Sequence, residues 1–264
     1  MYCPEKYIRG NGLQRRDAED ISNRFIEKMI WKPNEIVLDV GCGPGDVSSN
    51  ILYPLLKNKI KRMVGVDRSI QMVEHAKKTY GYPKLEFKVL DIENVNECIS
   101  YTNSFDKIFS FFCFHWIHKK ADALINMKTM LKSGGEILLH FMLVNPIVEL
   151  YKYIDAEWQI FVKDTRQPNN SYSQDEVKTM FIEAGFRIIN SESSVRKYTY
   201  PDLTSILDAI KSVDDMYNVL PPQLHDRYSM HIKDKILEKK MFNICPNTKV
   251  ITSLNWRIMI IFSN

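Results

Sequence analysis

Residues 35–46 read EIVLDVGCGPGD, a short apolar run that ends in three glycines at alternate positions. An amphipathic segment, residues 47–56, follows at once. This order predicts a strand, a tight turn and a helix, the unit with which a doubly wound sheet builds a cofactor pocket. Glycines permit close approach of the backbone, and the start of the new helix presents unpaired N–H groups and the positive end of its dipole.

The spacing of the glycines distinguishes between classes of ligand. Dinucleotide-binding turns read G-x-G-x-x-G, whereas Gly41, Gly43 and Gly45 give G-x-G-x-G, and Asp39 precedes the first glycine by two residues. A carboxylate at Asp39 would repel a pyrophosphate, but it suits a ligand that carries an ammonium group and a sulfonium. The stretch therefore favours S-adenosylmethionine, with Asp39, Gly41 and Gly43 as candidate cofactor-binding residues.

Acidic residues also follow the next two expected strands. Asp67 closes the run RMVGV at 62–66, and Asp91 closes LEFKVL at 85–90. Because parallel strands bring their carboxyl ends to one edge of a sheet, we expect these acids to lie together where ligands bind in such folds. Asp67 could accept both ribose hydroxyls, Asp91 could reach the adenine amino group, and Ile92 could contact the ring.

Strands and helices alternate four times over about 110 residues. Further strands are expected at 106–112 and 136–143, and the helices between strands include one at 70–80 that Ser69 caps. Such alternation is typical of a parallel sheet with helices on both faces, an α/β fold.

The segments on either side of this core have a different pattern. Residues 1–12 are expected to be irregular, and a helix is expected from Leu13 to about Ile30. After residue 144 we expect a helix over 146–161, a polar loop over 163–171, a helix from the Ser173 cap to Gly185, a strand over 186–200, helices over 201–240 broken at Pro221-Pro222, and a closing strand over 249–262. We therefore expect one domain, 1–264, comprising an N-terminal helical segment and lid (1–34), a cofactor-binding core (35–144), and a cap with the closing strands (145–264).

The composition excludes several classes of protein. A hydrophobic fraction of 45% in 264 residues supports a substantial core, and a net charge of +4 is too small to indicate nucleic-acid binding. The five cysteines form no C-x-x-C pair, which argues against a disulfide framework and a zinc site. The longest apolar stretch, 137–144, is too short to span a bilayer, and the first ten residues lack a signal-peptide core. We expect a cytoplasmic protein that binds neither metal nor nucleic acid and does not insert into membranes. Whether it forms a homodimer stays open.

Four motifs in this order carry a family resemblance: DVGCGPGD, GVDRS, VLDIE and FSFFCFHWI. They resemble the class I S-adenosylmethionine-dependent methyltransferases, and among these most of all the insect juvenile hormone acid methyltransferases. The His115-Trp116 pair and the N-terminal pattern from Tyr7 through Asn11 and Gln14 to Asp17-Ala18 add to the likeness, which extends from about residue 6 to 160. The resemblance implies a Rossmann-like, mostly parallel seven-stranded sheet with helices on both faces and a helical cap.

The resemblance also implies a reaction and its residues. In that family farnesoic acid or juvenile hormone acid becomes its methyl ester, and the cofactor becomes S-adenosylhomocysteine. A carboxylate is ionised at neutral pH, so it needs only alignment by neutral donors, for which the resemblance indicates Gln14 and Trp116. Further candidates are Tyr7, Arg68 and Ser110 for the cofactor, and His115, Met142, Ile147 and Tyr151 for the substrate.

Two alternatives stay open. The first is a methyltransferase for another small carboxylic acid, against which the many apolar residues after 143 count. The second is a diverged paralogue that binds the cofactor with little turnover. It is motivated by VKDTRQPNNSY at 162–172, which departs from the family pattern.

Overall fold

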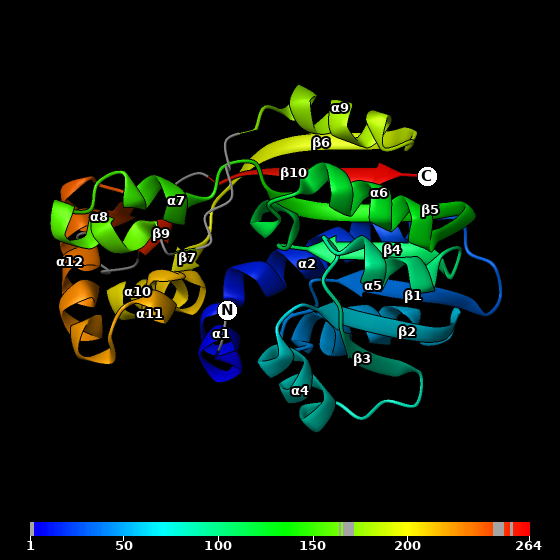
Figure 1. The fold of residues 1–264 in the computed structure, drawn as a ribbon, viewed down its shortest axis with the longest axis horizontal. Coiled ribbons are helices and arrows are strands. Elements are labelled where there is room, and N and C mark those ends of the chain that lie inside the picture. The colour runs from blue at the N-terminus through cyan, green and yellow to red at the C-terminus, as the bar shows by residue number, and fades with distance from the viewer. Residues whose placement is uncertain (1–2, 164, 166–171, 245–250, 254–255) are drawn as a thin grey trace.

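A seven-stranded sheet forms the centre of the computed structural model, which describes residues 3–163, 165, 172–244, 251–253 and 256–264 (Figure 1). The strand order is β3-β2-β1-β4-β5-β10-β6, and β10 runs antiparallel to both of its neighbours while the other pairs are parallel. The strands are β1 (Glu35–Val40), β2 (Ile60–Asp67), β3 (Leu85–Val89), β4 (Phe105–Phe111), β5 (Leu131–Met142), β6 (Ile188–Arg196) and β10 (Trp256–Ser263). The expected seven-stranded, mostly parallel sheet is confirmed.

Helices cover both faces of the sheet, and the period-two alternation of the strands explains how one sequence serves both. On one face Val37, Phe109 and Leu138 pack with α2 (Gly12–Phe25), α3 (Tyr53–Leu56) and α4 (Ile70–Thr79). On the other, Leu38, Ile108 and Leu139 pack with α5 (Val95–Cys98), α6 (Lys120–Met130) and α9 (Gln174–Glu183). Both faces are buried, which is why these strands read as continuous apolar runs.

A second group of helices, the cap, lies beside the sheet and has a core of its own (Figure 1). It comprises α7 (Pro146–Tyr151), α8 (Ala156–Val162), α10 (Leu203–Val213), α11 (Met216–Val219), the 3-10 turn Pro222–Leu224 and α12 (His225–Glu238). A buried carboxylate, Asp214, ties three of its segments together: it accepts hydrogen bonds from the hydroxyls of Tyr151 and Tyr228 and from the N–H of Met216. The break at Pro221-Pro222 is confirmed.

Several elements differ from expectation. Residues 4–10 form a helix, α1 (Pro4–Gly10), in place of an irregular segment, and Pro4 suits its first turn because its ring fixes φ. The helix expected over 146–161 is divided into α7 and α8. The strand expected over 186–200 is divided into β6 and β7 (Thr199–Tyr200), and β7 joins a small sheet with β9 (Ile251–Ser253) and β8 (Phe242–Ile244) that the sequence did not predict.

Other expectations concern ends and loops. The helix from Leu13 is α2 continued by a 3-10 turn, Ile26–Lys28, and Ser69 and Ser173 cap α4 and α9 as expected. Most of the polar loop expected over 163–171 and part of the closing strand expected over 249–262 lie outside the described residues. In the described part of the chain, every helix is too short or too polar to cross a bilayer.

Candidate active site

The turn after β1 has the geometry that its glycines allow. Gly41 and Gly45 have φ values of +75° and +83°, a region that side-chain-bearing residues rarely adopt. A Cβ on Gly41 would lie 2.2 Å from the Sγ atom of Cys113, and one on Gly45 would lie 2.8 Å from the Cβ of Ala76. The backbone therefore approaches its neighbours as closely as the glycines permit, and it forms one wall of a cavity.

Asp67 connects this turn to the loop after β2. Its Oδ2 atom accepts a hydrogen bond from the N–H of Gly43 at 3.0 Å, and its Oδ1 atom accepts one from the N–H of Ser69 at 2.8 Å. Burial raises the pKa of Asp67, and these two N–H donors oppose that rise. The carboxylate is thus fixed while each oxygen keeps a lone pair for a ligand.

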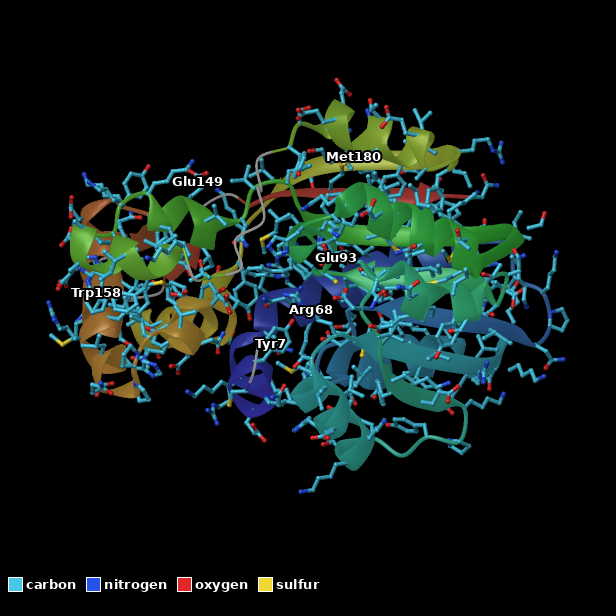
Figure 2. The ribbon with its side chains drawn as sticks, viewed as in Figure 1. Tyr7, Arg68, Glu93, Glu149, Trp158 and Met180 are labelled. Atoms are coloured by element: carbon cyan, nitrogen blue, oxygen red, sulfur yellow. The ribbon has the colours of Figure 1, made fainter. Side chains whose placement is uncertain are left out.

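This first cavity has a volume of about 330 Å³. Its expected lining residues are Tyr7, Gly41, Gly43, Asp67, Arg68, Asp91 and Ile92, together with Trp116, which was expected beside the methyl donor. Its unexpected ones include Phe112, Cys113, Val213 and Asp215. The N–H of Glu93 donates a hydrogen bond to the Oδ1 atom of Asp91 at 3.0 Å, and this bond orients the carboxylate. Tyr7, Arg68 and Glu93 lie along the boundary between the sheet and the cap (Figure 2).

The residues present fit S-adenosylmethionine. Asp67 offers two acceptors suited to a ribose diol, and Asp91 offers one to an amino group. Ile92 is an apolar neighbour for a ring, and the glycine turn leaves the backbone open at Gly43, where an added Cβ would meet only the ring of Tyr7 at 4.0 Å.

Two expected cofactor residues, Asp39 and Ser110, are not among the residues that line the cavity. Asp39 is 2% exposed, and its Oδ2 atom accepts from the hydroxyl of Ser48 at 2.5 Å. Burial raises its pKa to about 7. Ser110 donates to the carbonyl of Val40 at 2.9 Å. Both side chains are engaged beneath the turn: Asp39 joins β1 to the π-helical segment Ser48–Leu52 that follows the turn, and Ser110 joins β4 to β1.

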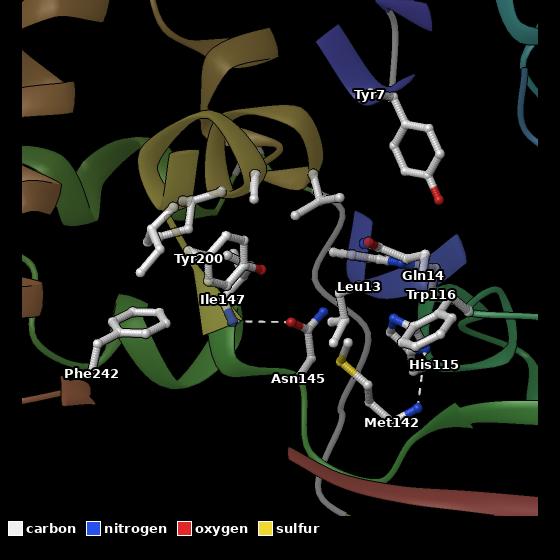
Figure 3. A pocket seen from close by; sticks show the side chains of 15 residues that line it. Tyr7, Leu13, Gln14, His115, Trp116, Met142, Asn145, Ile147, Tyr200 and Phe242 are labelled. Carbon is white, nitrogen blue, oxygen red and sulfur yellow. Dashed lines mark hydrogen bonds between the residues drawn. The ribbon is translucent and has the colours of Figure 1, made fainter. Parts of the chain in front are cut away.

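A second, smaller cavity of about 50 Å³ adjoins the first (Figure 3). It is lined by Tyr7, Leu13, Gln14, Phe112, His115, Trp116, Met142, Asn145, Ile147, Tyr200, Ile206, Ala209, Ile210, Val213 and Phe242. Five expected substrate residues, Gln14, His115, Trp116, Met142 and Ile147, are thus brought together. The described lining includes no Lys, Arg, Asp or Glu, so the polar groups of this cavity are neutral donors and acceptors.

Tyr151 does not reach this cavity. It is 4% exposed within the cap core, and its hydroxyl donates to Asp214. That internal partner fixes the side chain, which is the physical reason that the expected substrate contact is absent from the structure.

The two cavities share a wall formed by Tyr7, Phe112, Trp116 and Val213. Phe112 has a positive φ of 52°, an unusual conformation for an aromatic residue, and its N–H donates to the carbonyl of His140 at 2.8 Å. This strained residue directs the chain from β4 into the 3-10 turn Phe114–Trp116. The turn therefore delivers Trp116 to the junction of the two cavities.

His115 is held neutral next to the second cavity. Its Nδ1 atom accepts from the N–H of Met142 at 3.4 Å, and burial, assisted by the nearby Lys120 ammonium, lowers its pKa to about 3. It is therefore a neutral imidazole at physiological pH.

Some lining residues were not predicted from the sequence. Asn145 could have been recognised, because an Asn before a proline is a helix-capping signal next to the expected cap. Tyr200, Phe242 and the α10 residues carry no such signal, since only the packing of the cap brings them to the cavity.

Comparison with known proteins agrees with this geometry. A family model described as a methyltransferase domain matches residues 32–185. The juvenile hormone acid O-methyltransferase of Drosophila melanogaster is 32% identical over 84% of this chain and 78% of its own length. That of Bombyx mori is 28% identical over 100% of this chain and 97% of its own length.

A solved structure gives the same fold. The YcgJ protein of Bacillus subtilis aligns with a TM-score of 0.60 and 16% identity, over 94% of this chain and 97% of its own. With the glycine turn, the strand-end acids and these relatives together, the chain belongs to the class I S-adenosylmethionine-dependent methyltransferases, in the group that includes the juvenile hormone acid O-methyltransferases.

Proposed function

We propose that the protein is a carboxyl O-methyltransferase that converts a lipophilic isoprenoid acid, such as farnesoic acid or juvenile hormone acid, to its methyl ester. The observation that carries this proposal is the second cavity. Most of the side chains that line it are apolar, its polar side chains are uncharged, and it shares lining residues with the cofactor cavity. The names of the relatives from Drosophila melanogaster and Bombyx mori support an acid of this class.

The lining suits an ionised carboxylate. A carboxyl group has a pKa near 4, so at neutral pH its oxygen is already nucleophilic and no general base is required. Neutral donors can orient that oxygen without forming the tight ion pair that a lysine or arginine would form, and such an ion pair would reduce its reactivity. The neutral His115 is consistent with this, since it adds no positive charge to the cavity.

In this proposal Gln14 and Trp116 orient the acid. Gln14 comes from α2 and Trp116 from the 3-10 turn after β4, and each can donate one N–H to a carboxylate oxygen. When bound, S-adenosylmethionine supplies an activated methyl group. Tyr7, Phe112 and Val213 border the junction of the two cavities, where the methyl group and the carboxylate oxygen would meet.

The remaining surface of the cavity suits a hydrocarbon chain. Leu13, Ile147, Ile206, Ile210 and Phe242 line it, and burying apolar chain against such side chains contributes about 25 cal/mol per Å². A small polar acid would leave this surface without a partner, so the lining favours a lipophilic substrate. The cavity volume of about 50 Å³ is smaller than an isoprenoid chain, so side chains of the lining must move apart to admit one.

The test is a methylation assay with radiolabelled S-adenosylmethionine and a panel comprising farnesoic acid, juvenile hormone acid, straight-chain fatty acids of several lengths and trans-aconitic acid. We expect methyl esters from the isoprenoid acids and little from trans-aconitic acid. Farnesol is the control, because it has the same chain and no carboxylate. Tight binding of S-adenosylhomocysteine with no ester from any acid would overturn the proposal in favour of a cofactor-binding paralogue.

A further inference from the structure

Asn145 lies where β5 passes into the cap, and half of its side-chain amide is already engaged. It precedes Pro146 as the capping residue of α7, and its Oδ1 atom accepts from the N–H of Ile147 at 3.0 Å. This bond fixes the orientation of the amide, because Oδ1 and Nδ2 lie on opposite sides of the same planar group. Figure 3 shows the oxygen joined to Ile147 and the nitrogen on the side away from that bond.

The other half of the amide is buried without a partner. Asn145 is 2% exposed, and its Nδ2 atom has no hydrogen bond to any residue that the structure describes. A buried donor without a partner destabilises the folded state, and natural proteins rarely leave one in place. The capping bond prevents the amide from turning over to relieve this cost, so Nδ2 remains a donor.

The position of this donor indicates what it binds. Asn145 lines the second cavity together with Gln14 and Trp116, and the rest of the described lining is largely apolar. We propose that Asn145 is a substrate-binding residue whose Nδ2 group donates a hydrogen bond to the carboxylate of the acid. The proposal rests on the proposed function, and it adds a neutral donor from the cap to those from α2 and the turn after β4.

The same geometry distinguishes a carboxylic acid from the corresponding alcohol. Gln14 and Trp116 belong to the body that surrounds the sheet, whereas Asn145 belongs to the start of the cap. A carboxylate that contacts all three is held across the boundary between the two parts, with its chain directed among the α10 side chains. The corresponding alcohol has one oxygen and no charge, so it gains less from the third donor.

Two substitutions separate this role from helix capping. Asp and Ser both accept hydrogen bonds as helix caps, so Asn145→Asp and Asn145→Ser retain the bond to Ile147 and remove the Nδ2 donor. Asn145→Asp also places a negative charge beside the carboxylate. Asn145→Leu removes both functions and reports the cost of losing the cap. Ser173→Asp, which introduces the same charge at the cap of α9, is the matched control.

The measurements are the melting temperature, the KM for farnesoic acid, and calorimetric titrations of S-adenosylhomocysteine and then of farnesoic acid or farnesol into the product complex. For Asn145→Asp and Asn145→Ser we expect melting temperatures and S-adenosylhomocysteine affinities close to those of the wild type. Loss of a hydrogen bond to a charged group should weaken acid binding and raise KM by about 10- to 100-fold, most in Asn145→Asp. Farnesol binding should change little, and Ser173→Asp should behave as the wild type.

The outcomes distinguish the two proposals. If the wild type forms methyl esters and both cap-retaining variants keep its KM, Asn145 is only a helix cap. The inference about Asn145 then fails while the proposed function stands. If the wild type forms no ester, the proposed function fails; acid binding to the product complex then decides the role of Asn145. Equal acid affinity in the wild type and Asn145→Asp, or no acid binding at all, overturns the proposed role of Asn145 in substrate binding.

Discussion

Among single residues, Asp67 contributes most to the geometry of the cofactor cavity, because one carboxylate receives N–H groups from two separate turns. Asp39, Asp67 and Asp91 follow three successive strands and looked equivalent in sequence. In the folded protein Asp67 and Asp91 face the cavity, whereas Asp39 is turned to Ser48. The pattern of acids therefore predicted the correct edge of the sheet, but the side-chain direction of each acid depends on local hydrogen bonds.

We expect Asp67→Ala to weaken the affinity for S-adenosylhomocysteine by about 1–3 kcal/mol, since a charged acceptor is lost. Calorimetry measures this directly. Asp226→Ala, which removes an exposed carboxylate in the cap, serves as the control. An unchanged affinity in Asp67→Ala would remove this residue from the site.

Gln14→Ala and Trp116→Phe should each lower kcat/KM for the acid by roughly 10- to 100-fold, because each removes a neutral donor to a charged oxygen. Gln14 does not line the first cavity, so Gln14→Ala should leave S-adenosylhomocysteine binding intact. Equal losses of acid turnover and product affinity in Gln14→Ala would indicate a structural role instead.

Asp39 should give stability a dependence on pH. Its folded pKa of about 7 exceeds the ordinary value of 3.8, so the folded state holds its proton more tightly than the unfolded state. Between about pH 4 and pH 7 the unfolded chain therefore binds fewer protons, and the free energy of unfolding falls as pH rises, by at most about 4 kcal/mol, levelling off above pH 7.

Asp39→Asn should abolish that contribution. Urea denaturation at pH 4.5, 6, 8 and 9 should show the variant gaining stability relative to the wild type as pH rises, with little further gain between pH 8 and pH 9. Asp175→Asn, at an exposed position in α9, is the control. A constant difference across these pH values would contradict the shifted pKa.

Among the elements, the strands of the core were predictable because each is an apolar run bounded by turn residues. α1 was not, because seven residues offer too little periodicity and its stability comes from packing. Gly10 shows this contact: a Cβ added to it would lie 2.9 Å from the Cα of Ala209 in α10. β8 and β9 are three residues each and depend on one another for pairing, which no local pattern reveals.

The contact between α1 and α10 positions Tyr7, so disturbing it should affect both cavities. Gly10→Ala would ordinarily favour a helix, but here the added methyl must displace α1 from the backbone of α10. We expect weaker S-adenosylhomocysteine binding and a higher KM for the acid, by several-fold each. Gly81→Ala is the matched control, because a Cβ at Gly81 meets no atom within 4 Å. Wild-type affinities in Gly10→Ala would show that Tyr7 is positioned by other contacts.

At the scale of the whole molecule, the two cavities differ in how much of their lining could be predicted from the sequence. The cofactor cavity is formed mainly by loops at one edge of the sheet, and the order of strands determines that edge. The second cavity combines Leu13 and Gln14, Trp116, Asn145 and Tyr200, which are far apart in the chain. Its composition depends on how the cap packs against α1 and α2, and that packing has no short-range signal.

Tyr7 and Val213 stand in the wall of both cavities, and this has a thermodynamic consequence. A ligand that orders these side chains from one side prepares the surface that the other ligand meets, so the two bind with positive linkage. Reciprocity requires that the acid tighten S-adenosylhomocysteine by the same factor that S-adenosylhomocysteine tightens the acid, about 5- to 150-fold for typical coupling energies. Titrations in both orders should return one factor, and Gly10→Ala should reduce it. The side chains that border both ligands would then also make each ligand an effector of the other.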